Sequence, residues 1–244
     1  MLSFQNVTKR FPNGTLALDG ASFEIARGEF VSLVGPSGCG KSTALRLIAG
    51  LTLPNSGTVS WSSAAPKLGF VFQDAALMPW ATVERNVRLP LELAATDETT
   101  AKSRVAEALD LVGLEKFAHV YPRELSGGMR MRVSIARALA ADPAVLLMDE
   151  PFAALDELTR ERLNDELREL WAAKNLTIVF VTHSIYESVY LSSRTIVMSP
   201  RPGKVVADIP MPEPKARDPE FRTTSIYGDR CRAVRTALHA GENA

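Results

Sequence analysis

Hydrophobic and polar positions near the N-terminus alternate in a way that predicts strands before any helix. The period of two over residues 2–11 and 16–25, with the turn signal Pro-Asn-Gly at 12–14 between them, predicts a small antiparallel piece. The apolar run at 29–35 predicts a strand that is buried on both faces. A glycine-rich loop and then a helix over 42–51 follow this strand.

The middle of the chain has a helical pattern. Strand-like runs at 58–61 and 68–72 come first, and three helices are then expected, over 82–93, 97–113 and 126–140. We therefore expect a helical subdomain at about residues 80–140, inserted between strand-forming regions.

Strands and helices alternate again after this region. The expected strands are 144–150, 176–183 and 194–200, with 204–211 as an edge strand, and the expected helices are 157–173 and 184–191. The first of these helices carries an apolar stripe of Leu158, Leu163, Leu167, Leu170 and Trp171. Strands that alternate with helices predict a parallel α/β core.

The tail, from about residue 209 to 244, contains one helix or two around Gly228, with a start signal at Asp218-Pro219. Its five arginines are Arg217, Arg222, Arg230, Arg232 and Arg235. The simplest interpretation is a solvated helix packed on the core. A regulatory contact or support of a dimer is the alternative.

Composition restricts the class of protein. The 244 residues suffice for one domain or two closely packed ones, and a hydrophobic fraction of 46% is ordinary for a globular chain. The net charge is zero, which gives no reason to expect nucleic acid as a partner. No apolar run approaches the roughly 18 residues that span a bilayer, and no signal peptide is expected. With only Cys39 and Cys231, we expect a soluble, cytosolic protein with two unpaired thiols.

The loop after the buried strand fits the phosphate-binding pattern G-x-x-x-x-G-K-[ST]. Its glycines let successive N–H groups face a phosphate, Lys41 suits the β- and γ-phosphates, and the Ser42 hydroxyl suits Mg²⁺. The candidate nucleotide-binding residues of the loop are Gly35, Pro36, Ser37, Gly38, Cys39, Gly40, Lys41, Ser42 and Thr43. The preceding strand and following helix are the context that this motif requires, so a chance glycine-rich turn is the weaker alternative.

Polar side chains end three other expected strands. Asp149 suits the Mg²⁺ shell and Glu150 can polarise an attacking water, although two acids can also simply cap a strand. His183 and Gln73 end two further strands, and ligands bind at the carboxyl ends of parallel strands. His183 is therefore a candidate γ-phosphate contact rather than a structural histidine, and Gln73 a candidate for orienting water or touching Mg²⁺.

A second candidate anion site opens the helix at 126–140. Ser126, Gly127 and Gly128 leave backbone N–H groups and the positive end of the helix facing outward. One chain therefore contains two phosphate sites.

Taken together, these motifs resemble the ATP-binding cassette (ABC) family of transporter ATPases over about residues 2–208. The ordered set is the glycine-rich loop, Gln73, Leu-Ser-Gly-Gly-Met, Val-Leu-Leu-Met-Asp-Glu-Pro, Ala-Leu-Asp and Val-Thr-His. The resemblance implies an α/β P-loop NTPase fold, with a RecA-like core, an N-terminal antiparallel β subdomain and an inserted helical subdomain. It divides the chain into an ABC ATPase domain at 1–208 and a helical tail at 209–244.

The resemblance implies ATP and Mg²⁺ as cofactors and roles for single residues. Lys41 binds phosphate with the loop amides, Ser42, Gln73 and Asp149 serve Mg²⁺, and Glu150 is the catalytic base. Gln73 also senses the nucleotide and couples to a membrane partner.

The same resemblance implies a head-to-tail homodimer. The helix start at 126–128 of one copy closes over the γ-phosphate in the other copy, His183 contacts that phosphate, and Asp156 helps to join the subunits. Phe11 matches the aromatic residue that stacks on adenine, with a hydrophobic plug in the hairpin as the alternative. Met129 and Met131 depart from the family pattern, where glutamine is usual.

The implied partners are integral-membrane permease subunits and, indirectly, a periplasmic or extracellular substrate-binding protein, with the chain peripheral on the cytoplasmic face of the inner membrane. An apolar cluster after Gln73, made of Leu77, Met78, Pro79 and Trp80, either belongs to the core or receives the permease. Several stretches resemble importer ATPases for nitrate, taurine or alkanesulfonates. A pyrimidine or vitamin-precursor importer stays open.

Two further classes compete with a transport motor. The first is a soluble cassette ATPase acting on DNA or the ribosome. The short gap between 42 and 126, which lacks sustained heptads, is less consistent with DNA-repair relatives, and a single set of cassette motifs is less consistent with translation-factor relatives. A scaffold without turnover is less consistent with the presence of Lys41, Asp149, Glu150 and His183.

Overall fold

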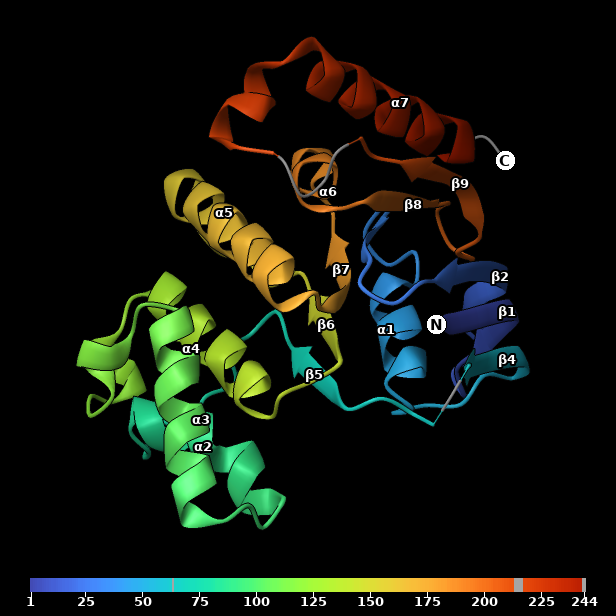
Figure 1. Ribbon diagram of the computed structural model, residues 1–244. Helices are drawn as coiled ribbons and strands as arrows, with labels where there is room; N and C mark the ends of the chain where they lie inside the picture. Colours follow the sequence, from blue (N-terminus) through green and yellow to red (C-terminus); the bar gives the residue numbers. More distant parts are fainter. Residues whose placement is uncertain (63, 213–216, 243–244) are drawn as a thin grey trace. The chain divides into compact units, whose positions relative to one another are not determined.

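The computed structural model describes residues 1–62, 64–212 and 217–242. The chain forms two compact units (Figure 1). Unit one contains Met1–Pro66 and Leu167–Ala244, and unit two contains Lys67–Glu166. Of the predicted tail at 209–244, residues 213–216 and 243–244 lie outside the described residues.

An antiparallel sheet forms the N-terminal part of unit one. It contains β1 (Leu2–Arg10), β2 (Leu16–Ile25) and β4 (Ser56–Trp61) in the order β2-β1-β4. The apolar positions of the alternating pattern form its core, where the rings of Phe4 and Phe23 stack with centroids 4.6 Å apart. The predicted antiparallel hairpin is therefore confirmed.

The other strands of unit one form the α/β core. Their order is β7 (Thr177–Thr182), β3 (Phe30–Val34), β8 (Arg194–Met198) and β9 (Val205–Pro210). Strand β3 is parallel to β7 and β8, whereas β9 is antiparallel to β8 and lies at the edge. Every residue of β3 and β7 is buried, as their continuous apolar runs predict.

The segments that connect these strands contain helices. Helix α1 (Lys41–Ile48) follows the glycine-rich loop, and α6 (Ile185–Leu191) connects β7 to β8. The tail contains the 3-10 helix η3 (Pro219–Thr223) and a single helix α7 (Ser225–Glu242), which runs through Gly228 and packs against α6, β8 and β9 (Figure 1).

Unit two combines a strand pair with a helical bundle. Its elements are β5 (Leu68–Val71), β6 (Val145–Asp149), α2 (Val83–Leu93), α3 (Glu98–Leu111), the 3-10 helices η1 (Glu115–Phe117) and η2 (Pro122–Glu124), and α4 (Gly127–Ala140). Strands β5 and β6 are parallel, and α2, α3 and α4 pack on one another. Polar side chains begin each of these helices, since Thr82, Asp97 and Ser126 accept hydrogen bonds from first-turn N–H groups.

The residues of α5 (Glu157–Lys174) are divided between the two units. Four members of its predicted apolar stripe are at most 8% exposed, but Leu158 is 80% exposed, so its assignment to the stripe was wrong. The reason is geometric. Leu158 precedes Leu163 by five residues, which places it about 140° around the helix at roughly 100° per residue.

The expectation of a solvated arginine-rich tail is wrong for Arg217. This side chain is 3% exposed and precedes η3. Its Nη1 donates to the carbonyl oxygens of Val189, Tyr190 and Ser192, at 2.8, 2.7 and 2.9 Å. The guanidinium therefore caps the carbonyl end of α6, where a positive charge also complements the helix dipole.

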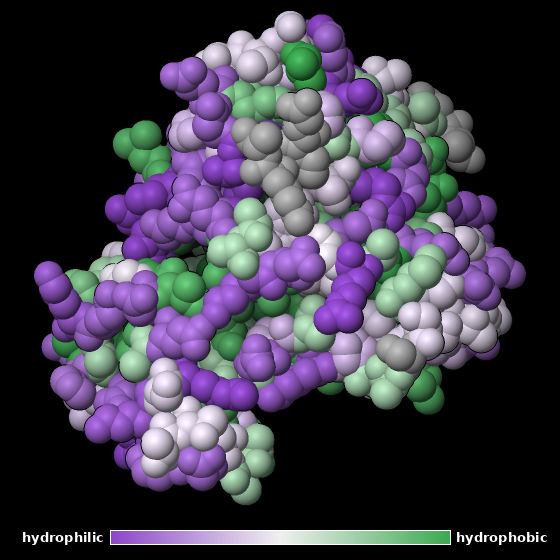
Figure 2. All heavy atoms as spheres, viewed as in Figure 1, coloured by the Kyte–Doolittle hydropathy of each residue, from purple (hydrophilic) through white to green (hydrophobic). Residues whose placement is uncertain are grey.

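On the face shown in Figure 2, hydrophilic side chains predominate and hydrophobic ones appear among them. Within the described residues, no helix is long and apolar enough to cross a membrane. The fold is that of a P-loop NTPase, an α/β protein with an additional antiparallel sheet, as predicted.

Candidate functional site

The glycine-rich loop is packed tightly against its own unit. A Cβ atom on Gly35 would lie 2.7 Å from Cys39 Sγ and 2.8 Å from the carbonyl oxygen of Met198, distances that no side chain tolerates. The sequence therefore needs glycine here because β8 approaches the backbone, as well as for access to a phosphate.

Lys41 is buried inside this loop, at 4% exposure. Its ammonium donates to the carbonyl oxygens of Gly35 at 2.8 Å and Pro36 at 3.0 Å, and lies 3.9 Å from Cys39 Sγ. Burial raises the pKa of the Cys39 thiol, against an opposing effect of Lys41. The loop thus holds a cation beside the N-terminus of α1, where free N–H groups attract anions.

His183 lies next to this loop in the sheet. Thr182 is the register partner of Val34, so His183 and Gly35 both follow the carboxyl ends of neighbouring parallel strands. The backbone at this strand end is fixed, because Thr182 Oγ1 accepts from Ser184 N–H at 3.0 Å and Thr182 also bonds Glu187. The imidazole is exposed.

Phe11 lies at the hairpin turn of the antiparallel sheet. Its backbone N–H donates to Thr15 O at 2.9 Å, and its ring is half-buried, with Lys9 Nζ 5.6 Å from the ring centroid. Part of the ring therefore stays accessible, as stacking on a base requires.

In unit two, Asp149 is the last residue of β6, and Gln73 lies two residues beyond β5. Met148 is the register partner of Val71, so both residues belong to the same end of this strand pair. Asp149 and Glu150 are half-buried and Gln73 is exposed. Glu150 has a φ of 46°, a strained conformation for a residue with a side chain.

The start of α4 is open to the surface. Ser126 Oγ accepts from Met129 N–H at 3.2 Å, and both Ser126 and Gly127 are exposed, whereas Gly128 is buried. Met131 is 4% exposed in the interior of unit two, so an apolar side chain suits that position. Nothing in the structure explains Met129.

Asp156 caps the next helix. Its Oδ1 accepts from Thr159 N–H at 3.0 Å, and this hydrogen bond lowers the pKa of the exposed Asp156 carboxyl. The carboxylate therefore stays charged at the surface just before α5 begins.

Sequence reasoning missed two residues that fix the loop after Gln73. Asn86 is fully buried and its amide donates to the carbonyl oxygens of Met78, Ala81 and Thr82 at 3.0–3.1 Å. Arg137 donates to the carbonyl oxygens of two further loop residues, each at 2.8 Å. Trp80 is held 77% exposed on this loop, while Leu77 and Met78 are half-buried. The sequence signal that could have found Asn86 is a polar residue at a buried position of the apolar pattern of α2.

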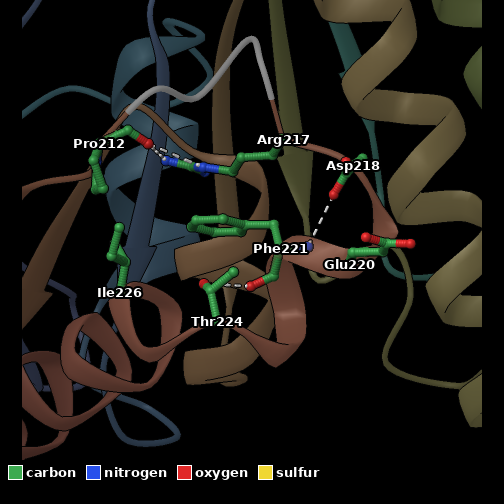
Figure 3. A pocket seen from close by; sticks show the side chains of 7 residues that line it. All are labelled: Pro212, Arg217, Asp218, Glu220, Phe221, Thr224 and Ile226. Atoms are coloured by element: carbon green, nitrogen blue, oxygen red, sulfur yellow. Dashed lines mark hydrogen bonds between the residues drawn. The ribbon is translucent and has the colours of Figure 1, made fainter.

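The tail contains a cavity of about 380 Å³ (Figure 3). Arg217 Nε and Nη2 donate to Pro212 O at 3.2 and 2.8 Å, and the guanidinium lies 5.0 Å from the Phe221 ring centroid. The other lining residues are Asp218, Glu220, Thr224 and Ile226. None of the predicted nucleotide-site residues lines this cavity.

Comparison with known proteins relates this geometry to one family. The model of the family described as ABC transporter matches residues 18–153. The Brucella abortus biovar 1 protein BruAb2_1123 is 46% identical over 231 residues, which cover 93% of this chain and 88% of that protein.

A second relative is the aliphatic sulfonates import ATP-binding protein SsuB of Bacillus cereus (strain ZK / E33L). It is 43% identical over 229 residues, which cover 90% of this chain and 90% of that protein. A solved dimeric structure of the ATP-binding cassette MJ0796, in a post-hydrolysis state with ADP and Pi, matches with a TM-score of 0.76. It is 36% identical, with 86% of this chain and 99% of that chain covered.

Proposed function

This chain belongs to the ABC transporter family and hydrolyses ATP to drive transport, and from that premise we propose that it energises an importer for a small anion of the alkanesulfonate, taurine or nitrate type. The Bacillus cereus relative is named for the import of aliphatic sulfonates, and this name supports the proposed substrate class. No residue of the ATP site recognises that substrate, so the permease and a substrate-binding protein select it.

One observation carries the proposed mechanism. The chain has two anion sites of opposite character, a glycine loop whose Lys41 is buried and bonded within its own unit, and an exposed helix start at Ser126. We infer that two copies assemble head to tail, so that Ser126, Gly127 and Gly128 of one copy complete the ATP site on the loop of the other. The dimeric state of the MJ0796 structure supports this arrangement.

In this proposal the loop amides and Lys41 hold the phosphates. Lys41 exchanges its bonds with loop carbonyls for bonds with phosphate oxygens. The oxygen ligands that Mg²⁺ prefers would come from Ser42, Asp149 and Gln73. Mg²⁺, when bound, neutralises charge on the β- and γ-phosphates. Phe11 stacks on the adenine.

Hydrolysis then depends on Glu150 and His183. The Glu150 carboxylate takes a proton from the water that attacks the γ-phosphorus, the bond to the leaving ADP oxygen breaks, and His183 stabilises the γ-phosphoryl charge. Both copies contact the γ-phosphate, which ATP has and ADP lacks, so loss of this group opens the dimer. Asp156 supports the contact between the two subunits.

The membrane partner docks on the loop after Gln73. Asn86 and Arg137 hold this loop in place, and Trp80 offers an exposed aromatic side chain. The chain is thereby peripheral on the cytoplasmic face of the inner membrane, attached through permease subunits.

Replacing Glu150 with glutamine tests the proposal. E150Q keeps the size and loses the base, so ATP turnover should fall on the order of 100-fold or more while ATP binding persists. Light scattering should then find an ATP-dependent dimer of the purified variant. Turnover at the rate of the unmodified chain would contradict the assignment of Glu150 as base.

The same variant tests the transport role. In a strain that lacks this gene, the unmodified gene should restore growth on an alkanesulfonate as sole sulfur source or on nitrate as sole nitrogen source, and E150Q should not. Growth of the deletion strain on every tested anion would refute the proposed substrate class.

A further inference from the structure

The turn between β8 and β9, residues 199–203, forms a rigid support beside the glycine loop. Ser199 N–H donates to Lys204 O at 2.9 Å, and Ser199 Oγ accepts from Lys204 N–H at 3.0 Å, which closes the turn on itself. Ser199 Oγ also lies 3.1 Å from Pro202 O. The turn therefore has a defined shape before any ligand binds.

Gly203 ties this turn to the antiparallel sheet and to the glycine loop. Its N–H donates to Ala17 O at 3.0 Å, and its carbonyl accepts from Asp19 N–H at 3.1 Å. A Cβ atom on Gly203 would lie only 1.9 Å from the carbonyl oxygen of Cys39. The backbone of the turn is therefore in direct contact with the loop that holds phosphate.

Arg201 extends from this turn onto the loop. Its Nε donates to Gly38 O at 3.0 Å, and its Nη2 lies so close that a Cβ on Gly38 would approach it to 2.6 Å. The side chain is exposed, and among the described residues Arg201 makes no ion pair. Neither burial nor a carboxylate accounts for its position, so the contact with Gly38 stands out.

This contact acts on one peptide unit. Arg201 holds the Gly38 carbonyl, while the N–H of the same peptide, on Cys39, donates to Pro36 O at 3.3 Å. Gly38 has a φ of 75° and no side chain, so these two hydrogen bonds, one at each end of the peptide, restrict its rotation. A rotated peptide would change the direction of the N–H groups that the loop offers to a phosphate.

We propose that Arg201 is a positioning residue for ATP, which restrains the Gly38–Cys39 peptide, and with it the N–H groups of the loop, and adds positive charge beside the loop. The proposal rests on the proposed role of this loop in holding the phosphates. A charged donor to a carbonyl is among the stronger hydrogen bonds, although exposure to water weakens it.

The test compares R201Q, R201K and K204Q in the full chain. Lys204 lies on the same turn and pairs with Asp19 at 3.1 Å, so K204Q removes one positive charge without touching the loop. We expect R201Q to weaken binding of a fluorescent methylanthraniloyl ATP about fivefold and to raise KM, with kcat at saturating ATP changed less than twofold. R201K, which keeps the charge and a donor, should recover most of the affinity, and K204Q should match the unmodified chain.

Two results would overturn the proposal. One is equal ATP affinity of R201Q and the unmodified chain. The other is equal loss in R201Q and R201K together with a lower melting temperature, which indicates a structural role only. K41A separates this failure from failure of the proposed function, because unchanged ATP affinity of K41A would refute the loop itself as the phosphate site.

Discussion

The glycine loop and the start of α4 are both suited to phosphate, but they are built in opposite ways. In the loop, Lys41 is 4% exposed and bonded to loop carbonyls, and Gly35 touches β8. At the helix start, Ser126 and Gly127 are exposed, and Ser126 bonds only within its own first turn among the described residues. A site closed within one unit can bind ATP by itself, whereas an exposed helix start gains a function when a second surface supplies the anion.

The chemistry of the two sites differs in the same direction. The loop has a buried ammonium, which makes a strong, permanent anion site. The helix start offers N–H groups, a helix dipole and a serine hydroxyl, which still carries a proton to donate after accepting one bond. Its nearby cation is the exposed Arg130, whose Nη1 donates to Leu125 O at 2.6 Å. We therefore expect the loop to set ATP affinity and the helix start to set dimer closure and turnover.

Replacing Ser126 with arginine should give the largest effect on this contrast. S126R places a long side chain where the partner copy's ATP would enter, so the ATPase rate should fall on the order of 100-fold. Binding of ATP to the monomer should stay unchanged, because Ser126 has no part in the loop. ATP affinity and turnover are measured on the same purified variant by fluorescence titration and phosphate release.

S126A is the matched control for this variant. It also loses the hydrogen bond to Met129 N–H, at a cost of about 1 kcal/mol to the helix, but it adds no bulk. A monomer of S126R that fails to bind ATP would contradict the separation of the two sites.

A pair of glycine-to-alanine changes tests the difference in packing. In G203A the new methyl group meets Cys39 O and displaces the loop, with a strain of about 2 kcal/mol. Carried into binding, this strain corresponds to roughly 30-fold weaker ATP affinity. In G127A the nearest atom would be 3.7 Å away, so monomer affinity should not change and the helix should become slightly more stable.

Urea unfolding and ATP titration of both variants measure the result. Equal effects of G203A and G127A on ATP affinity would show that the loop is no more tightly packed than the helix start.

The sequence predicts the parts of the molecule that depend on local pattern. The loop from Gly35 to Thr43, the buried strands and the cap at Ser126 follow from spacing and residue type, since their structure is determined within a few residues. Leu158 was misassigned because the apolar stripe was read without its angular period.

Long-range polar contacts could not be predicted in the same way. Arg217 caps α6 from 25 or more residues away, and Arg201 reaches Gly38 across 163 residues of sequence. Their sequence surroundings resemble those of any surface arginine, and only the folded chain brings them to a carbonyl. Asn86 is an intermediate case, because its partners lie within eight residues but in an irregular loop.

The rate of thiol alkylation should also differ between the two sites, by a smaller factor than the ATPase rate or the ATP affinity. Burial raises the pKa of Cys39, so its thiol stays protonated and shielded, and burial does the same for Cys231 in α7. A cysteine introduced by S126C lies at an exposed helix N-terminus, which favours the thiolate. At pH 8, iodoacetamide should therefore modify S126C about tenfold faster than Cys39.

Peptide mass spectrometry follows all three thiols in one sample, with Cys231 as the internal reference for a buried thiol. Modification of Cys39 as fast as that of S126C would mean that the loop opens to solvent as readily as the helix start, and the contrast between a closed and an open site would fail.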